Sequence, residues 1–194
     1  MPKALSPEVI PHPRRPKEPQ MIRNVHERTI DSPASVLGPL LDELGGVKDR
    51  LWPSALWVPM VLDRPLSVGA DGGHGSIRYQ VTEYKPGRRV RFRFHRSTGI
   101  IGVHELSIEP LGEDHCRLRH VLLGRPRGVM QVLFPLVVGP IHNAVIEDLF
   151  DNAERESTGR VARPASHTPW VRLCTRLLKR RERSAGEQGT EVTR

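Results

Sequence analysis

The sequence lacks the features that define secreted, cysteine-rich or membrane-spanning proteins. Its 194 residues include only Cys116 and Cys174, too few for a disulfide scaffold or a cysteine-rich zinc site. Residues 1–20 have no apolar stretch typical of a secretory signal. The longest apolar run, residues 128–141, is interrupted by a glutamine and two prolines and falls short of the roughly 20 residues that cross a bilayer. These absences predict a protein of the reducing cytoplasm without a membrane span.

The net positive charge comes from the two ends of the chain. Residues 21–154 hold 16 basic and 16 acidic residues, whereas residues 155–194 hold 10 basic and 4 acidic ones. Binding to nucleic acid through counterion release needs Lys and Arg gathered on one surface. We therefore expect no nucleic-acid binding through the central domain. Any partner that is attracted by basic residues is expected to bind the tail.

Proline and charge patterns divide the chain into five parts. Six prolines fall within the first 20 residues, a density that no helix or central strand tolerates. The expected organisation is a disordered Pro-rich arm (1–21), one folded domain (22–156), a flexible linker (157–169), a basic amphipathic helix (170–183) and a disordered end (184–194).

The folded domain begins with a short strand over residues 24–31, followed by Ser32 and Pro33, a pair typical of a helix start. Pro39 cannot donate its N–H to a helical ladder. We therefore expect two short, angled helices over residues 33–44, ending at two consecutive glycines.

The pattern then changes to a period of two. Apolar and polar residues alternate over 77–82 and 90–94, and two further runs, 100–109 and 115–124, are joined by residues 111–114. These connections are too short for crossover helices, so the strands form an antiparallel sheet with one apolar face. No phosphate-binding glycine motif is present.

From Pro140 the apolar period becomes 3.6, which predicts a long closing helix over residues 141–154. This helix must cover the apolar face of the sheet. The predicted class is α+β, with a cavity between sheet and helix.

Four segments resemble the START-like (SRPBCC) helix-grip superfamily, which includes polyketide cyclases, lipid-transfer domains and pollen-allergen-like carriers. They are residues 27–34 (ERTIDSPA), 84–92 (YKPGRRVRF), 102–104 (GVH) and 140–148 (PIHNAVIED). The resemblance covers about residues 22–156 and implies an antiparallel sheet wrapped around a long C-terminal helix. The superfamily shares no catalytic motif and includes both enzymes and pure binders, so the resemblance implies a fold rather than a reaction.

Three histidines are candidate catalytic residues. His104 and His120 share the inward-facing parity of their strands, and His142 falls near the middle of the apolar arc of the closing helix. Pairing Ile108 with Cys116 would place His104 directly across from His120. Such imidazoles can be hydrogen-bonded lining residues, proton-transfer groups or metal ligands; we predict no metal and no cofactor.

Further residues are expected to line the same cavity. Gly69–Gly75 is glycine-dense and is either an ordinary hairpin turn or a loop that presents His74 at the cavity mouth, while the two tryptophans line an entrance or fill the core. The full set of expected ligand-binding residues is Trp52, Trp57, His74, Tyr79, Phe92, Phe94, His104, Leu106, Leu118, His120, His142, Val145 and Leu149.

The sequence of the tail predicts a basic amphipathic helix. As a helix, residues 170–183 separate six apolar side chains from five basic ones. Such a helix binds an anionic membrane surface, docks on a partner, or packs on its own domain.

Together these observations predict a protein that binds or carries a small, largely apolar, lipid- or polyketide-like molecule. The alternatives are an aromatase/cyclase-type enzyme that uses the cavity histidines, and a scaffold protein at the membrane surface. The expected location is cytoplasmic, peripheral at the membrane if the tail binds lipid.

Overall fold

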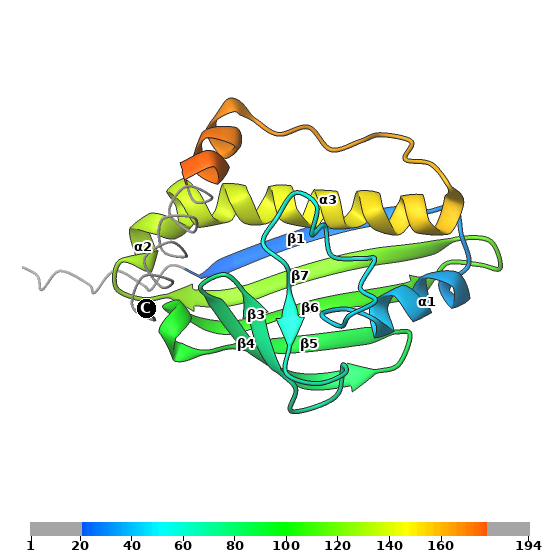
Figure 1. The fold of residues 1–194 in the computed structure, drawn as a ribbon, viewed down its shortest axis with the longest axis horizontal. Coiled ribbons are helices and arrows are strands. Elements are labelled where there is room, and N and C mark those ends of the chain that lie inside the picture. The colour runs from blue at the N-terminus through cyan, green and yellow to red at the C-terminus, as the bar shows by residue number, and fades with distance from the viewer. Residues whose placement is uncertain (1–20, 178–194) are drawn as a thin grey trace, which may run out of the picture.

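A curved antiparallel sheet covered on one face by a long helix forms the body of the protein in the computed structural model, which describes residues 21–177 (Figure 1). The elements are β1 (Ile22–Ile30), α1 (Ala34–Asp42), β2 (Val61–Leu62), β3 (Asp71–His74), β4 (Ile77–Lys85), β5 (Arg89–Phe94), the 3-10 turn η1 (Arg96–Thr98), β6 (Ile100–Pro110), β7 (Cys116–Pro126), α2 (Met130–Leu133), the π-helical turn η2 (Phe134–Val138) and α3 (Gly139–Thr158). A last helical segment spans residues 169–177. The predicted arm, the end of the predicted tail helix and residues 184–194 lie outside the described residues.

The seven strands follow the order β1-β7-β6-β5-β4-β3-β2, and each neighbouring pair is antiparallel. From β2 onward the strands form a meander, and the first strand closes the far edge by pairing with β7. This is the α+β helix-grip architecture, as the alternating strands and the closing helix predict.

The glycine-dense segment differs from the prediction. Residues 71–74 are strand β3, and the hairpin turn is confined to Gly75 and Ser76. A Cβ at Gly72 would lie 2.1 Å from the Val61 carbonyl oxygen, and one at Gly73 would lie 2.0 Å from the Ile77 carbonyl oxygen. The glycines therefore allow β2, β3 and β4 to approach closely, which is a strand function of glycine rather than a loop function.

The helical pair predicted after β1 is a single nine-residue helix, α1, that contains Pro39. Pro39 removes one hydrogen bond from the helical ladder. The helix is nevertheless held because Leu37, Leu40 and Leu41 are almost fully buried in the core.

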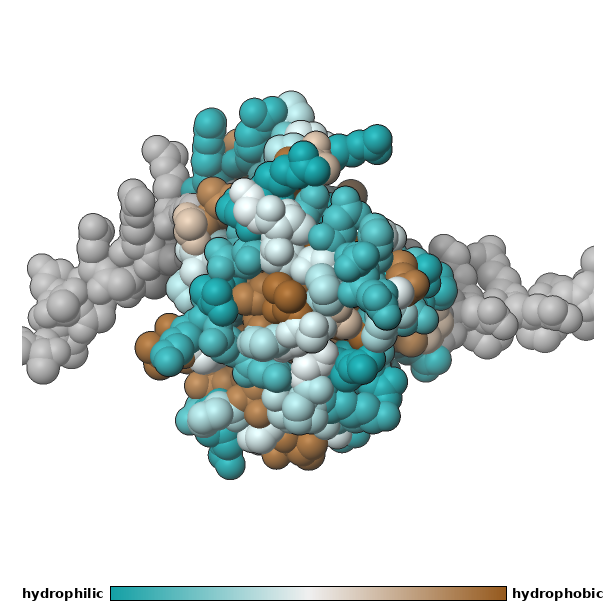
Figure 2. Space-filling model, turned by 90° about the vertical axis from the view of Figure 1, so that its right-hand side faces the viewer, coloured by the Kyte–Doolittle hydropathy of each residue, from teal (hydrophilic) through white to brown (hydrophobic). Residues whose placement is uncertain are grey.

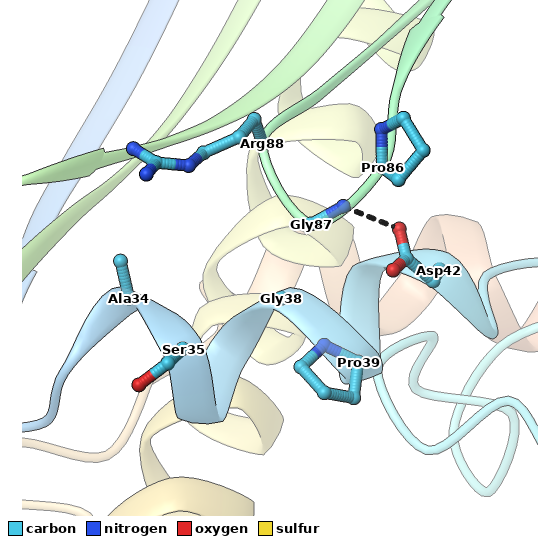
Figure 3. A pocket seen from close by; sticks show the side chains of 8 residues that line it. All are labelled: Ala34, Ser35, Gly38, Pro39, Asp42, Pro86, Gly87 and Arg88. Atoms are coloured by element: carbon cyan, nitrogen blue, oxygen red, sulfur yellow. Dashed lines mark hydrogen bonds between the residues drawn. The ribbon is translucent and has the colours of Figure 1, made fainter.

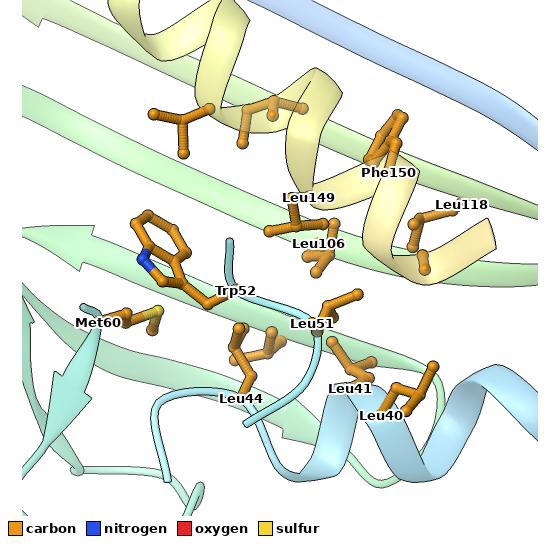
Figure 4. Close-up of a cluster of buried hydrophobic side chains, with 14 of the residues drawn as sticks. Leu40, Leu41, Leu44, Leu51, Trp52, Met60, Leu106, Leu118, Leu149 and Phe150 are labelled. Atoms are coloured by element: carbon orange, nitrogen blue, oxygen red, sulfur yellow. The ribbon is translucent and has the colours of Figure 1, made fainter. Parts of the chain in front are cut away.

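The main core lies between α1, the sheet and the second half of α3 (Figure 4). Leu41 and Phe150 are fully buried there, and Leu51 contributes from the loop that follows α1. A smaller cluster of Ile22, Ile100 and Leu122 lies at the other end of the sheet. The residues that the sequence predicts to face inward on β4 to β7 form the sheet side of the main core, and α1, the loop after it and α3 supply most of the rest.

Helix continues from α2 through η2 into α3, so that one helical stretch runs from Met130 to Thr158. By length and composition alone this stretch could cross a membrane, and a third of its most apolar window is buried in the structure. Residues 144–153 of this stretch pack on the sheet, which is the position expected of a core helix.

The segment after α3, predicted as a flexible linker, runs back along that helix (Figure 1). The Ala162 and Ala165 amides donate to the carboxylates of Glu154 and Asp151, at 2.9 and 2.8 Å. These bonds place residues 169–177 near the start of the helical stretch rather than free in solvent.

Candidate functional site

A row of aromatic and imidazole rings crosses the covered face of the sheet. Its members, in spatial order, are His26, His142, His120, His104, Tyr79, His74 and Trp52. Neighbouring ring centroids lie between 4.7 and 6.2 Å apart. We call this set the ring row. It extends from the edge strand β1, across β7, β6 and β4, to the loop that follows α1.

The structure brings the three candidate histidines together at the centre of this row. The Nε2 atom of His120 lies 3.5 Å from Nδ1 of His104, and the His120 ring centroid lies 5.0 Å from that of His142. The strands supply the first two side chains, and the first turns of α3 bring the third down from above.

The predicted strand register is wrong by two residues. Cys116 pairs with Pro110 rather than Ile108, so Leu106 lies opposite His120 and His104 lies opposite Leu122. The turn is shorter than expected, because the Leu111 amide donates to the His115 carbonyl oxygen at 3.0 Å. A shift of two residues leaves each side chain on the same face, and the two histidines therefore remain diagonal neighbours.

Burial keeps these imidazoles neutral. It lowers the pKa of His142 to about 3 and that of His74 to about 4. Burial, with the nearby positive charge that another protonated histidine would add, also lowers the pKa of His104 and His120 well below 6.5. At neutral pH each of these rings has one N–H donor and one acceptor nitrogen.

Several of those nitrogens have no hydrogen-bond partner among the described residues. They are Nε2 of His104, Nδ1 of His120 and Nδ1 of His142, all inaccessible to solvent. A buried polar group without a partner typically costs about 1–3 kcal/mol, so most native structures avoid it. Three such atoms in one cluster point to a place where a water or a ligand supplies the missing partners.

Aromatic rings surround the cluster. Phe92 and Phe94 stack on His104 with centroid distances of 4.8 and 5.0 Å, and Tyr79 meets it edge-on at 4.8 Å. The Tyr79 hydroxyl lies 3.1 Å from Nδ1 of His74. The predicted residues Phe92, Phe94, Tyr79 and His74 therefore lie beside the histidines.

The loop between α1 and β2 closes over this end of the row. The Trp52 ring centroid lies 4.7 Å from that of His74, and the Trp52 indole N–H donates to the Val58 carbonyl oxygen at 2.9 Å. The Trp57 indole donates to the buried Asp148 carboxylate of α3 at 2.6 Å. Both tryptophans are nearly buried, so they form a closed cover rather than an open entrance.

The other predicted lining residues belong to the packed core. Leu106, Leu118, Val145 and Leu149 are buried among apolar side chains of α1, the sheet and α3 (Figure 4). They lie on the predicted face, and they support the site from its α1 side.

Two pockets lie elsewhere, on the surface. One of about 290 Å³ lies between α1 and the β4–β5 turn, where the Gly87 amide donates to Asp42 at 2.7 Å (Figure 3). The other, of about 340 Å³, is lined by Arg96, Gly99, Ile101 and Arg127. Neither lies under α3, where the sequence predicts a cavity, because the rings and side chains described above fill that space.

Sequence reasoning overlooked His26, which has the same parity on β1 as the buried Ile22 and Ile30. Its Nδ1 lies 2.7 Å from the Glu147 carboxylate and its Nε2 lies 3.2 Å from the Asn143 side-chain oxygen. That parity is the signal that could have identified it. Within residues 21–177, no three His, Cys, Asp or Glu side chains are arranged to hold a metal ion.

Comparison with known proteins identifies the fold and not a family. No family model and no curated protein matches the chain. Norcoclaurine synthase from Thalictrum flavum, in complex with dopamine and hydroxybenzaldehyde, is a similar structure, with a TM-score of 0.55 and 13% identity over 81% of this chain and 100% of that one.

A protein from Thermobifida fusca has a TM-score of 0.53 and 14% identity, covering 76% of this chain and 99% of its own. A conserved Enterococcus faecalis protein of unknown function has a TM-score of 0.53 and 11% identity, covering 84% of this chain and 86% of its own. The chain thus has the helix-grip fold of these proteins.

Proposed function

We propose that this protein binds a small, largely apolar molecule that carries at least one polar group, at the histidine cluster between the sheet and α3. The observation that carries the proposal is the set of unpartnered ring nitrogens on His104, His120 and His142. A ligand hydroxyl or carbonyl can donate to or accept from a neutral imidazole, because each ring offers both functions.

The surroundings favour a flat ligand. Phe92, Phe94 and Tyr79 present ring faces and edges around His104, and aromatic surfaces of this kind stack well on planar molecules. The similar norcoclaurine synthase structure holds dopamine and hydroxybenzaldehyde, both small aromatic molecules with hydroxyl groups. That likeness supports the class of probe to try first.

Binding at this place requires side chains to move, since the interior is filled. The cover formed by Trp52 and Trp57 is the element to displace, because it belongs to the loop between α1 and β2 and not to a helix or strand. Three polar contacts hold that loop to α3: the Trp57 indole on Asp148, the Asn152 amide on the Leu51 carbonyl oxygen, and the exposed Arg50–Glu156 pair. Loops open at a lower free-energy cost than the core elements of a fold.

Proton-transfer catalysis, the cyclase-type alternative, is less well supported by the same cluster. A general acid or base works best with a pKa near the operating pH. With a pKa of about 3, His142 is protonated at neutral pH in roughly one molecule in ten thousand. Neutral imidazoles that bind and orient a polar group are the better description of this site.

The test measures binding and stability in the same variants. 4-Hydroxybenzaldehyde is titrated by calorimetry into the native protein, His104→Leu and His120→Leu, with His115→Leu as a control on an exposed histidine. Each lost hydrogen bond should weaken binding about five- to tenfold, the equivalent of about 1–1.5 kcal/mol.

His120→Leu should change the unfolding free energy of the unliganded protein by less than about 1 kcal/mol, because it removes a buried nitrogen without a partner and also leaves Nδ1 of His104 without its 3.5 Å contact. Native mass spectrometry of protein from its own host would identify the retained molecule. Equal affinity in all variants, together with loss of stability in His120→Leu, would show that the histidines serve the fold alone.

A further inference from the structure

Large apolar side chains are exposed along one face of the helical stretch that begins near Val129. Val129, Val132, Leu133 and Leu136 are 70, 59, 39 and 57% exposed. Their spacing of i, i+3, i+4 and i+7 places them on one side of the helix. A stripe of this kind normally faces a core, and here it faces outward.

A second exposed stripe adjoins it. In the segment 169–177, Val171 and Cys174 turn into the protein, whereas Trp170, Leu173 and Leu177 are 49, 47 and 53% exposed. The Trp170 indole donates to the Leu136 carbonyl oxygen at 2.7 Å, which fixes the two stripes side by side at the end of the molecule that carries α2 (Figure 1). We call the seven exposed residues of the two stripes the apolar ridge.

The residues that flank this ridge in the sequence carry positive charge without counter-charge. Arg125, Arg127, Arg172 and Arg176 are exposed, and no carboxylate within residues 21–177 lies at ion-pair distance from any of them. The sequence has no acidic residue from 115 to 146 or from 157 to 181.

Arginines further along the same strand, β7, behave differently. Arg117 pairs with Glu109 at 3.3 Å and Arg119 with Glu27 at 2.6 Å. The contrast indicates that the arginines near the ridge are available for an external anion.

A surface pocket lies next to the ridge. It has a volume of about 340 Å³ and places Arg96 and Arg127 together with Gly99 and Ile101. A Cβ at Gly99 would lie 3.3 Å from that of Met130, so the pocket adjoins the start of α2. Two arginines beside an apolar side chain suit a phosphate group attached to an apolar tail.

We propose that the apolar ridge docks the protein on the surface of an anionic phospholipid membrane, with Arg96 and Arg127 holding a lipid headgroup phosphate. The apolar side chains enter the headgroup and acyl boundary, the half-exposed Trp170 indole lies at the interface, and the arginines neutralise lipid charge. The membrane is favoured over a protein partner because the sequence on either side of both stripes carries arginines and no acidic residue.

The opposite end of the molecule offers no comparable surface. Figure 2 faces the end near α1, where hydrophilic residues cover most of the surface and hydrophobic ones are confined to small patches. Of these two ends, the α2 end is therefore the one that carries the apolar ridge, and α3, with His142 in its first turn, begins there. A membrane there would present apolar molecules close to the proposed site.

The test is co-sedimentation of the full chain with vesicles of phosphatidylcholine alone and of phosphatidylcholine mixed with phosphatidylglycerol. The ridge variant carries Val132→Glu and Leu136→Glu, and its control carries Val47→Glu and Val68→Glu, two exposed residues elsewhere. The charge variant carries Arg96→Gln and Arg127→Gln, and its control carries Arg88→Gln and Arg93→Gln, which are also exposed.

We expect binding to the anionic vesicles only, weakened by added salt and abolished in the ridge variant. The charge variant should bind about 30-fold more weakly, since each basic residue near an anionic leaflet contributes about 1 kcal/mol. Both controls should bind as the native chain does.

Three outcomes would overturn the proposal. They are equal binding to both vesicle types, no binding by the native chain, and equal losses in variants and controls. Size-exclusion chromatography tests whether a second copy of this chain covers the ridge instead. A dimer that dissociates in the ridge variant would assign the ridge to self-association and overturn the proposal.

Discussion

The two halves of α3 meet the sheet in opposite ways. In the second half, Arg28 of β1 donates to Asp151 at 2.7 Å and to Glu154 at 3.2 Å, so that largely buried charges are paired. In the first half, His142 lies beside His120, which lies beside His104, and each of these three has a ring nitrogen without a partner among the described residues. In one half of α3 the buried polar groups have partners, and in the other half some of them have none. A binding site usually differs from the rest of its fold in this way.

Acid should expose this difference most strongly. The folded-state pKa values of His142 (about 3) and His74 (about 4) lie below the 6.5 of an unfolded histidine. Between pH 6.5 and each folded-state pKa, the unfolded chain binds more protons than the folded protein does. The stability that these neutral histidines contribute is therefore complete above about pH 6.5 and is lost as the pH falls.

Each of these two histidines should remove about 1.4 kcal/mol of unfolding free energy per pH unit, or roughly 4 kcal/mol for both between pH 6.5 and pH 5. Urea unfolding at about pH 7 and about pH 5 measures the loss. His142→Phe should reduce this dependence, whereas His115→Phe, an exposed position, should not. A pH profile that is the same in all three proteins would mean that the first half of α3 is as well solvated as the surface.

The ion-paired half is tested by Arg28→Met, which keeps most of the side-chain volume and removes the charge. Asp151, Glu154 and Glu147 would then share no cation, and Asp151 is only 9% exposed. Removal of one partner from a buried pair costs about 3 kcal/mol.

The matched control is Arg119→Met, which breaks an exposed pair with Glu27 on the neighbouring strand and should cost under about 1 kcal/mol. Both losses are measured by urea unfolding. Similar losses in the two variants would indicate that the α3 pairs contribute no more than surface pairs.

Most of the fold could be predicted from the sequence, because the alternation over β4 to β7 and the helical period of α3 follow directly from burial of one face. The strand register could not, since a shift of two residues preserves the inward face and only the turn between β6 and β7 distinguishes the alternatives. For the same reason the histidine cluster was predictable even though the pairing was wrong.

Two other features depend on contacts that a linear pattern does not contain. Gly72 and Gly73 were assigned to a turn because glycine favours turns, and only the close approach of β2 and β4 explains them as strand residues. The space under α3 is filled partly because Trp52 packs on the His74 ring and Trp57 donates to the Asp148 carboxylate. The spacing of the two tryptophans in the sequence does not predict these contacts.

Glu147 lies where the two halves meet, and it gives the smallest and most specific test. One of its oxygens lies 2.7 Å from His26 Nδ1, at the end of the ring row, and the other accepts from Arg28 at 3.0 Å. The side chain is 41% exposed, so Glu147→Gln should cost only about 0.5 kcal/mol of unfolding free energy.

A double-mutant cycle decides which half Glu147 belongs to. Glu147→Gln is combined with Arg28→Met in one cycle and with His26→Gln in the other, and all proteins are unfolded in urea. If Glu147 is part of the ion-paired half, its coupling energy with Arg28 exceeds that with His26, because Arg28 carries a permanent charge. A larger coupling with His26 would instead extend the polar network of the ring row to the edge of the sheet, and the boundary between the two halves would then lie one turn further along α3.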